Sequence, residues 1–216
     1  MKKLVWILSC LLVSPVFAEN AIPFCIQMST SIHVKTRPGN TKYVTQYSKE
    51  AFLRQAETPF SPHTLGLTVA KLDVHVETKP QLTQQLGQIC VALSDVTVDM
   101  HYPSLVVYID KKYPPSSCAY QVVKEHEDYH VAVAQEALSF FKDDVEKNVA
   151  KTVMQLAPKI VYTRTEIPSV VHKFNNAITK ALRPLVEHIN KKLIEKNQAI
   201  DTPEMYKETT AMCKDW

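Results

Sequence analysis

Two histidines and a glutamate stand at a spacing that can hold a metal ion and activate water. His126 and His130 are four residues apart, so on a helix both rings project from one face, one turn apart. Glu127 lies about 100 degrees further round the helix, where it can reach a water in an open coordination position. Zinc lowers the pKa of such a water toward ~7, and Glu127 can accept its proton and pass it to a leaving amine. The pattern predicts zinc-dependent peptide hydrolysis, with His126 and His130 as ligands and Glu127 as the catalytic acid/base.

A catalytic zinc site needs a third protein ligand, and the sequence leaves its identity open. In one large class of zinc proteases the third ligand is a glutamate on the next helix, a role that Glu187 or Glu166 could fill. Glu136 is six residues beyond His130, which places it far along the helix axis and badly rotated. The remaining candidates are histidines elsewhere in the chain and polar groups near its end, namely His101, His172, His188, Asp201, Glu204 and Tyr206.

The motif lies inside a segment with helical periodicity. From Cys118 to about Asn148, apolar residues recur at helical spacing, and Pro114-Pro115-Ser116-Ser117 supplies a helix stop followed by a serine cap. A second long helix is predicted to begin near Pro168, and Pro184 should kink or split it. The tail from Asp201 to Trp216 is expected to form a turn and a short helix.

The first half of the chain favours strands. Phe24 to Lys35 alternates in part, and after a turn signal at residues 37–40 the segment Tyr43 to Tyr47 could return as the second arm of a hairpin. Further strand patterns cover Leu65–Val76, Cys90–Met100 and Ser104–Ile109, and the last of these is either an inner strand or an edge strand that pairs with an extended peptide. Strands followed by helices predict an α+β fold, in which a mostly antiparallel sheet is packed by the His-Glu-x-x-His helix and the long C-terminal helix.

The first 18 residues are predicted to be a secretory signal peptide. Lys2 and Lys3 precede an apolar stretch from Leu4 to Phe17, and small side chains surround the expected cut after Ala18. The apolar stretch is shorter than the roughly 20 residues that a membrane-spanning helix needs. We therefore expect a single α+β domain over residues 19–216, a secreted or periplasmic location, and no integral membrane segment after the signal is removed.

The charge of the chain gives no electrostatic reason to expect a nucleic acid or an anionic membrane as partner. The formal net charge of the whole chain is +3, and it falls toward neutral once Lys2 and Lys3 are removed. The expected partner is a peptide or protein substrate.

Four cysteines remain beyond the predicted signal, and an oxidising compartment favours two disulfides. Three pairings are possible. We predict Cys90 with Cys118, which would join a strand to the start of the motif helix, and Cys25 with Cys213, which would join the two chain ends. Zinc ligation by these cysteines is disfavoured, because no two of them have Cys-x-x-Cys spacing.

The segment Cys118-Ala119-Tyr120, with the His-Glu-x-x-His motif and Val131 and Val133 after it, resembles a bacterial family of uncharacterised, predicted secreted zinc-dependent proteases. The resemblance extends from about Leu65 to Phe141. It implies a zincin-like fold, a zinc cofactor bound by His126 and His130, and Glu127 as the catalytic acid/base. Many members of the family end with Tyr-Asp-x-x-Thr-x-His-Gly. Near its own end this chain has Ile200-Asp201-Thr202-Pro203-Glu204-Met205-Tyr206, which keeps the aspartate but not the His-Gly.

The missing family histidine keeps a second class of function open. In this alternative the chain is a non-catalytic envelope protein, with a structural zinc or an unmetallated histidine pair, that acts as a binding or assembly module. A site closed by four protein ligands would favour it over catalysis.

Overall fold

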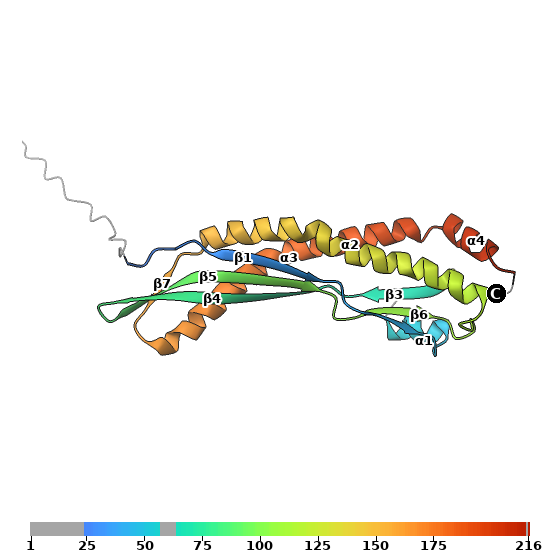
Figure 1. The fold of residues 1–216 in the computed structure, drawn as a ribbon, viewed down its shortest axis with the longest axis horizontal. Helices are drawn as coiled ribbons and strands as arrows, with labels where there is room; N and C mark the ends of the chain where they lie inside the picture. The colour runs from blue at the N-terminus through green and yellow to red at the C-terminus, as the bar shows by residue number, and fades with distance from the viewer. Residues whose placement is uncertain (1–23, 57–63, 215) are drawn as a thin grey trace, which may run out of the picture.

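The computed structural model describes residues 24–56, 64–214 and 216, and the predicted signal at residues 1–18 lies outside these ranges. The predicted α+β class is confirmed, since strands fill most of the first half and helices most of the second (Figure 1). In chain order the elements are β1 (Ser31–Arg37), β2 (Thr41–Val44), α1 (Lys49–Gln55), β3 (Gly66–Ala70), β4 (Asp73–Gln85), β5 (Gln88–His101), β6 (Leu105–Ile109), α2 (Cys118–Gln155), β7 (Lys159–Val161), the 3-10 turn η1 (Arg164–Glu166), α3 (Ile167–Ile200) and α4 (Pro203–Ala211).

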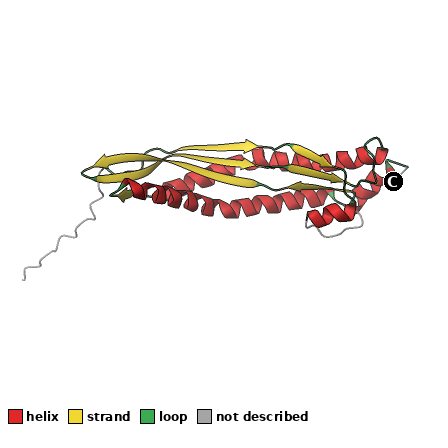
Figure 2. Ribbon diagram, turned by 90° about the horizontal axis from the view of Figure 1, so that it is seen from below, coloured by secondary structure: helices red, strands yellow, loops and turns green. Residues whose placement is uncertain are grey.

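The described strands form two sheets placed end to end, where the sequence led us to expect one (Figure 2). In the first sheet β5 lies between β1, which is parallel to it, and β4, which is antiparallel, and β7 pairs with the start of β5. In the second sheet β6 lies between β2, which is parallel to it, and β3, which is antiparallel. Antiparallel pairing therefore predominates, as predicted, but β6 is an inner strand and β3 is the edge strand next to the motif helix.

Gly39, Pro38 and Pro103 lie where the first sheet ends and the second begins. At this point β1 continues into β2, and β5 continues into β6. Gly39 has φ +75°, and a Cβ there would lie 2.3 Å from the carbonyl oxygen of Tyr102. On either side of this contact the amide of Tyr102 donates to Arg37 and that of Leu105 to Asn40. Pro38 and Pro103 have no amide hydrogen to add to either ladder. The chain therefore continues forward from β1 into β2, and the predicted hairpin between these segments is wrong.

The predicted strand from Leu65 to Val76 is also two strands. β3 pairs with β6 and β4 pairs with β5, and the break at residues 71 and 72 falls level with the other two breaks. The apolar positions change from odd numbers, Leu67 and Val69, to even numbers, Leu72 and Val74, so the alternation shifts by one residue at the break, and the prediction of a single strand overlooked this shift. The division matters because it places β3, with Gly66 and Thr68, beside the motif.

Two long helices cover one side of the sheets and enclose the main core. α2 packs on β1, β3 and β6, while α3 packs on β4 and along α2. Ser117 caps α2 by accepting from the amide of Tyr120 at 3.1 Å, as the serine-rich entrance predicts. α3 is continuous through Pro184, so of the two predicted effects of this proline, a kink or a split, the split does not occur. The opposite face of the second sheet is covered by α1, where Phe52 stacks on Tyr108.

Both predicted disulfide pairings are wrong. The structure pairs Cys25 with Cys90 and Cys118 with Cys213, with Cα–Cα distances of 5.2 and 5.8 Å. The reason is the elongated shape, in which β5 begins at one end of the molecule and α2 begins at the other (Figure 1). Each bond therefore joins segments that share one end of the molecule. Among the described residues, no helix is both long enough and apolar enough to cross a membrane.

Candidate metal centre

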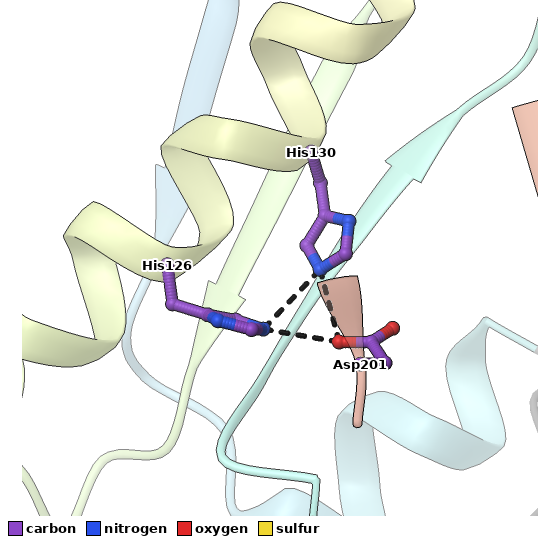
Figure 3. Close-up of side chains that lie close together, drawn as sticks. All are labelled: His126, His130 and Asp201. Atoms are coloured by element: carbon purple, nitrogen blue, oxygen red, sulfur yellow. Dashed lines mark hydrogen bonds and ion pairs between the residues drawn. The ribbon is translucent and has the colours of Figure 1, made fainter. Parts of the chain in front are cut away.

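The two motif histidines and one aspartate converge on a single point. Nε2 of His126 lies 3.0 Å from Oδ1 of Asp201, and Nε2 of His130 lies 3.1 Å from the same oxygen. The two Nε2 atoms are 3.3 Å apart, and both rings turn from α2 toward the carboxylate (Figure 3). Both side chains are buried, although histidine is more often partly exposed in proteins.

Asp201 reaches this point because the chain turns sharply between two helices. α3 ends at Ile200, and α4 begins at Pro203, where a proline is tolerated in the first turn. Thr202 caps α4 by accepting from the amide of Met205 at 3.2 Å. The carboxylate of Asp201 is left between the helix ends and faces α2.

The three atoms have the spacing of ligands on one zinc ion. Zinc bonds of about 2.0–2.1 Å at tetrahedral angles place neighbouring ligand atoms about 3.3 Å apart. The observed separations of 3.0, 3.1 and 3.3 Å need only a small expansion to match this value. Two imidazoles and one carboxylate also form a donor set that binds divalent transition metals. His126, His130 and Asp201 could therefore hold a metal ion.

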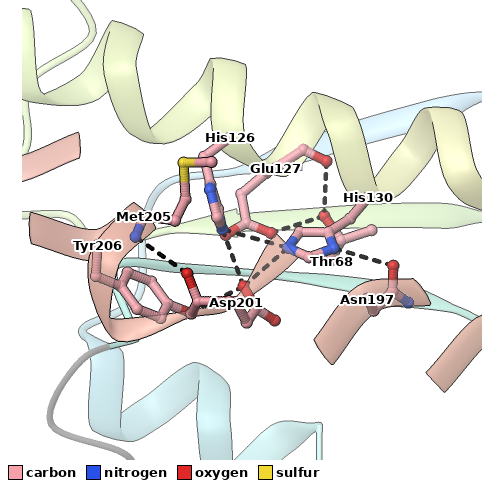
Figure 4. A network of polar contacts seen from close by, with 9 residues as sticks. Thr68, His126, Glu127, His130, Asn197, Asp201, Met205 and Tyr206 are labelled. Carbon is pink, nitrogen blue, oxygen red and sulfur yellow. Dashed lines mark hydrogen bonds and ion pairs between the residues drawn. The ribbon is translucent and has the colours of Figure 1, made fainter. Parts of the chain in front are cut away.

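Outer hydrogen bonds orient two of these three side chains, His130 and Asp201 (Figure 4). Nδ1 of His130 lies 3.0 Å from Oδ1 of Asn197, to which it can donate, so the neutral ring presents a lone pair at Nε2. The hydroxyl of Tyr206 donates to Oδ1 of Asp201 at 3.0 Å. Asn197 and Tyr206 thus fix the ring of one ligand and the carboxylate of another.

Protons and a metal would compete for the same position. In the metal-free protein burial opposes a charge on His130, but hydrogen bonds to Asp201 and Asn197 and the nearby Glu127 outweigh it and raise its pKa to about 9. Burial alone would raise the pKa of Asp201, yet its hydrogen bonds with the two histidines hold that pKa well below its usual range. A metal must therefore displace a proton, and it meets an ionised carboxylate.

Glu127 is buried beside the cluster and is held by β3. Its Oε2 accepts a hydrogen bond from Oγ1 of Thr68 at 2.8 Å. A Cβ at Gly66 would lie 2.7 Å from Oε1 of Glu127, so the carboxylate needs the space that a glycine leaves. Burial raises the pKa of Glu127, while His130 and Thr68 partly oppose the rise. The residue is thus a carboxylate with increased affinity for a proton.

A pocket of about 390 Å³ opens beside the cluster, between β3 and the end of α3. Glu127, His130 and Asp201 all line it, together with Gly66, Leu67 and Thr68 of β3. A second pocket shares Thr68, His130, Ile194 and Asn197 with the first, so the space continues along the groove between β3 and α3. A small molecule or a peptide segment can therefore approach Glu127 and two of the three ligands, His130 and Asp201, from one side.

The other candidates for the third ligand lie outside the cluster. His101 is on the first sheet near Asp73 and Asp99, and Glu166 closes a capping box with Thr163. His172 faces Asn176 on α3, and His188 packs against the ring of Phe141. Neither Glu136 nor Glu187 belongs to the group, and Glu204 lies in the first turn of α4. Tyr206 supports Asp201 through its hydroxyl.

Sequence reasoning missed Gly66, Thr68 and Asn197. All three act through non-local contacts, and their spacing relative to the motif carries no signal in one sequence. A glycine in a strand pattern can mark a close approach of another group, and Gly66 gives that weak hint.

No protein-family model, curated protein or solved structure matches the chain. The resemblance to secreted zinc-dependent proteases therefore stays a prediction from the residues that carry it.

Proposed function

We propose that the chain is an exported zinc-dependent metallopeptidase. The observation that carries this proposal is the meeting of His126, His130 and Asp201 beside Glu127, at the wall of an open pocket. Two disulfides among the described residues support an oxidising compartment, and hence a secreted or periplasmic protein.

Zinc in this site would supply Lewis acidity, which lowers the pKa of a water in the open position and polarises a substrate carbonyl. Glu127 accepts the proton of that water, and its burial supports this role because a raised pKa favours proton uptake. Thr68 holds one oxygen of Glu127 and leaves the other available for the proton. The deprotonated water would then add to the substrate carbonyl carbon, and Glu127 would pass the proton to the amine nitrogen as the carbon–nitrogen bond breaks, which completes hydrolysis of the peptide bond.

The same donor set also suits iron in oxygen-activating enzymes, where two histidines and one carboxylate leave several positions open. Glu127 favours hydrolysis, because a buried carboxylate beside the metal position has a direct task in moving the proton of a water. A structural zinc, the alternative kept open by the sequence, would need a fourth protein ligand. Among the described residues the cluster offers three, and the pocket adjoins it.

The edge strand β3 supports a peptide substrate. It pairs with β6 on one side only within the described sheets, and Gly66, Leu67 and Thr68 line the pocket. An extended peptide can add to such an edge through main-chain hydrogen bonds. A peptide bound in this way would pass along the pocket wall that holds Glu127 and His130.

Metal content and peptide cleavage by the mature chain test the proposal together. We expect one zinc per chain and cleavage of unstructured protein substrates. Glu127→Gln should keep the zinc and lower kcat by at least about a hundredfold, since general acid–base catalysis contributes 10²–10⁴-fold. Glu125→Gln, which removes an exposed carboxylate from the same helical turn, is the matched control and should keep full activity. Cleavage that survives Glu127→Gln would remove Glu127 from its role.

A further inference from the structure

The turn between β4 and β5 presents a leucine where backbone and solvent both disfavour it. Gln85 pairs with Gln88, and the two residues between them, Leu86 and Gly87, have φ values of +50° and +77°. Such a two-residue turn favours Asn-Gly or Asp-Gly, because an ordinary side chain is strained at positive φ. Leu86 is also 96% exposed. A strained leucine that is exposed to water does not stabilise the chain itself, so only a partner outside the chain could bury it.

Other exposed apolar side chains gather around the same hairpin. Of the thirteen large hydrophobic side chains that are exposed among the described residues, six lie at this end of the molecule, namely Ile26, Met28, Leu82, Leu86, Met154 and Tyr162. The Cys25–Cys90 disulfide and the contact of Gln81 with Met28 hold the N-terminal segment against the hairpin. β7 pairs with Ile89, which brings Tyr162 to the same place. We call these six side chains and their surroundings the hairpin end.

Positive charges outnumber negative ones at the hairpin end, although the net charge of the chain without Lys2 and Lys3 is close to neutral. No charged residue occurs between Lys79 and Asp95, a stretch that includes the whole turn. Four cations follow in the neighbouring segments, Lys151, Lys159, Arg164 and Lys173, against the single anion Glu166. The carboxylate of Glu166 is occupied by Thr163, which donates to it through its amide and its hydroxyl. Lys159 and Lys173 also line a pocket of about 470 Å³ beside β7.

We propose that the hairpin end docks the protein on an anionic lipid bilayer. Protruding apolar side chains with lysines around them are the features of a surface that inserts into the interface and is attracted by lipid phosphates. The apolar groups project from a turn and from strand and helix ends, so they fit a fluid apolar layer better than a rigid groove. The lack of charge along the turn removes the desolvation cost that a buried charge would add.

Docking at this end would hold the candidate metal site of His126, His130 and Asp201 away from the bilayer. The cluster lies in the first half of α2, and the helix continues from His130 to Gln155 toward the hairpin end (Figure 1). At a rise of 1.5 Å per residue this remaining length is about 37 Å. The groove beside β3 would face proteins that project from the membrane by a comparable distance. The docking does not depend on the proposed hydrolysis.

Co-sedimentation with lipid vesicles tests the docking. The mature chain, Glu19–Trp216, should bind vesicles that contain phosphatidylglycerol, bind neutral phosphatidylcholine vesicles less, and lose affinity as salt rises. Leu86→Asn should weaken binding about tenfold or more, because one fewer leucine enters the interface. The same variant should melt at an equal or higher temperature, since asparagine tolerates positive φ. A loss of binding therefore cannot be attributed to unfolding.

Two further variants separate the contributions. Met212→Asn removes an apolar side chain that is 64% exposed at the opposite end of the molecule, and this variant should bind like the wild type. Lys159→Gln and Lys173→Gln should each weaken binding to the anionic vesicles by about fivefold and leave binding to neutral vesicles unchanged. Equal binding by wild type and Leu86→Asn would overturn the proposal, and so would a lack of binding to anionic vesicles. A wild-type dimer that Leu86→Asn converts to a monomer would also overturn it, because the hairpin end would then be an interface between copies.

Discussion

Gly66 allows a sharp test of how closely the strand β3 controls the general base. In Gly66→Ala the new methyl group would lie 2.7 Å from Oε1 of Glu127, 2.8 Å from its Cγ and 2.9 Å from the carbonyl oxygen of Tyr108. The carbonyl belongs to the β6 ladder that pairs with β3, so it cannot move without loss of sheet pairing. The side chain of Glu127 is the group that must yield.

The size of the displacement sets the expected effect. Glu127 must retreat by roughly 0.7 Å to reach an ordinary contact of 3.4 Å with the methyl group. A misplacement of about 1 Å can lower a catalytic rate about a hundredfold, so we expect kcat to fall by about ten- to a hundredfold. Overpacking should also lower the free energy of unfolding by about 1–3 kcal/mol. Zinc affinity should be unchanged, because the three atoms nearest the methyl group belong to Glu127 and Tyr108 and none belongs to a ligand.

Steady-state peptide cleavage, zinc titration and thermal melting on the same preparations make the test. Gly87→Ala is the matched control, since it places alanine at φ +77° with no atom within 4 Å of the new Cβ. It should lower stability by about 1 kcal/mol and leave kcat unchanged. A folded Gly66→Ala protein with the kcat of the wild type would refute the reasoning, and a loss of zinc from that variant would show that the strand supports the ligands instead.

Two further predictions concern the disulfides and pH. The double variant Cys118→Ser/Cys213→Ser should weaken zinc binding about tenfold or more, because the Cys118–Cys213 disulfide holds the segment after α4, and with it the turn that carries Asp201, against α2. The double variant Cys25→Ser/Cys90→Ser should lower the stability of the fold and leave zinc affinity unchanged. Equal zinc affinity in the two double variants would contradict this. In the metal-free protein the raised pKa of His130 adds stability that is complete below its unfolded value of 6.5 and is lost as the pH rises through about 9. Zinc must displace that proton, so its apparent affinity should rise by up to about tenfold per pH unit between pH 7 and 9, and a flat titration profile would be inconsistent with the site.

The local features of the fold could be predicted from the sequence. The helical spacing after Cys118, the serine cap and the strands at residues 90–100 and 104–109 depend on neighbours in the chain, and the structure contains all of them. The motif histidines needed only the regular geometry of one helix to meet.

The features that depend on how distant segments of the chain pack together could not be predicted from the sequence. Asp201 was one of several candidates for the third ligand, and only the packing of α3 along α2 brings it to the histidines. The predicted pairing of Cys25 with Cys213 assumed that the chain ends meet, and that of Cys90 with Cys118 assumed that a strand lies beside the start of the motif helix. The elongated arrangement separates both pairs. Alternation of side chains likewise does not specify which strand becomes the partner, and for this reason β1 and β2 were mistaken for a hairpin.

A crystal of the protein grown with zinc and measured at the zinc absorption edge tests the central claim most directly. The account predicts one anomalous peak about 2.0–2.2 Å from Nε2 of His126, Nε2 of His130 and Oδ1 of Asp201, with a fourth position open to the pocket that Glu127 lines. A peak elsewhere, a fourth protein ligand in the open position, or no bound zinc at stoichiometric concentration would contradict it.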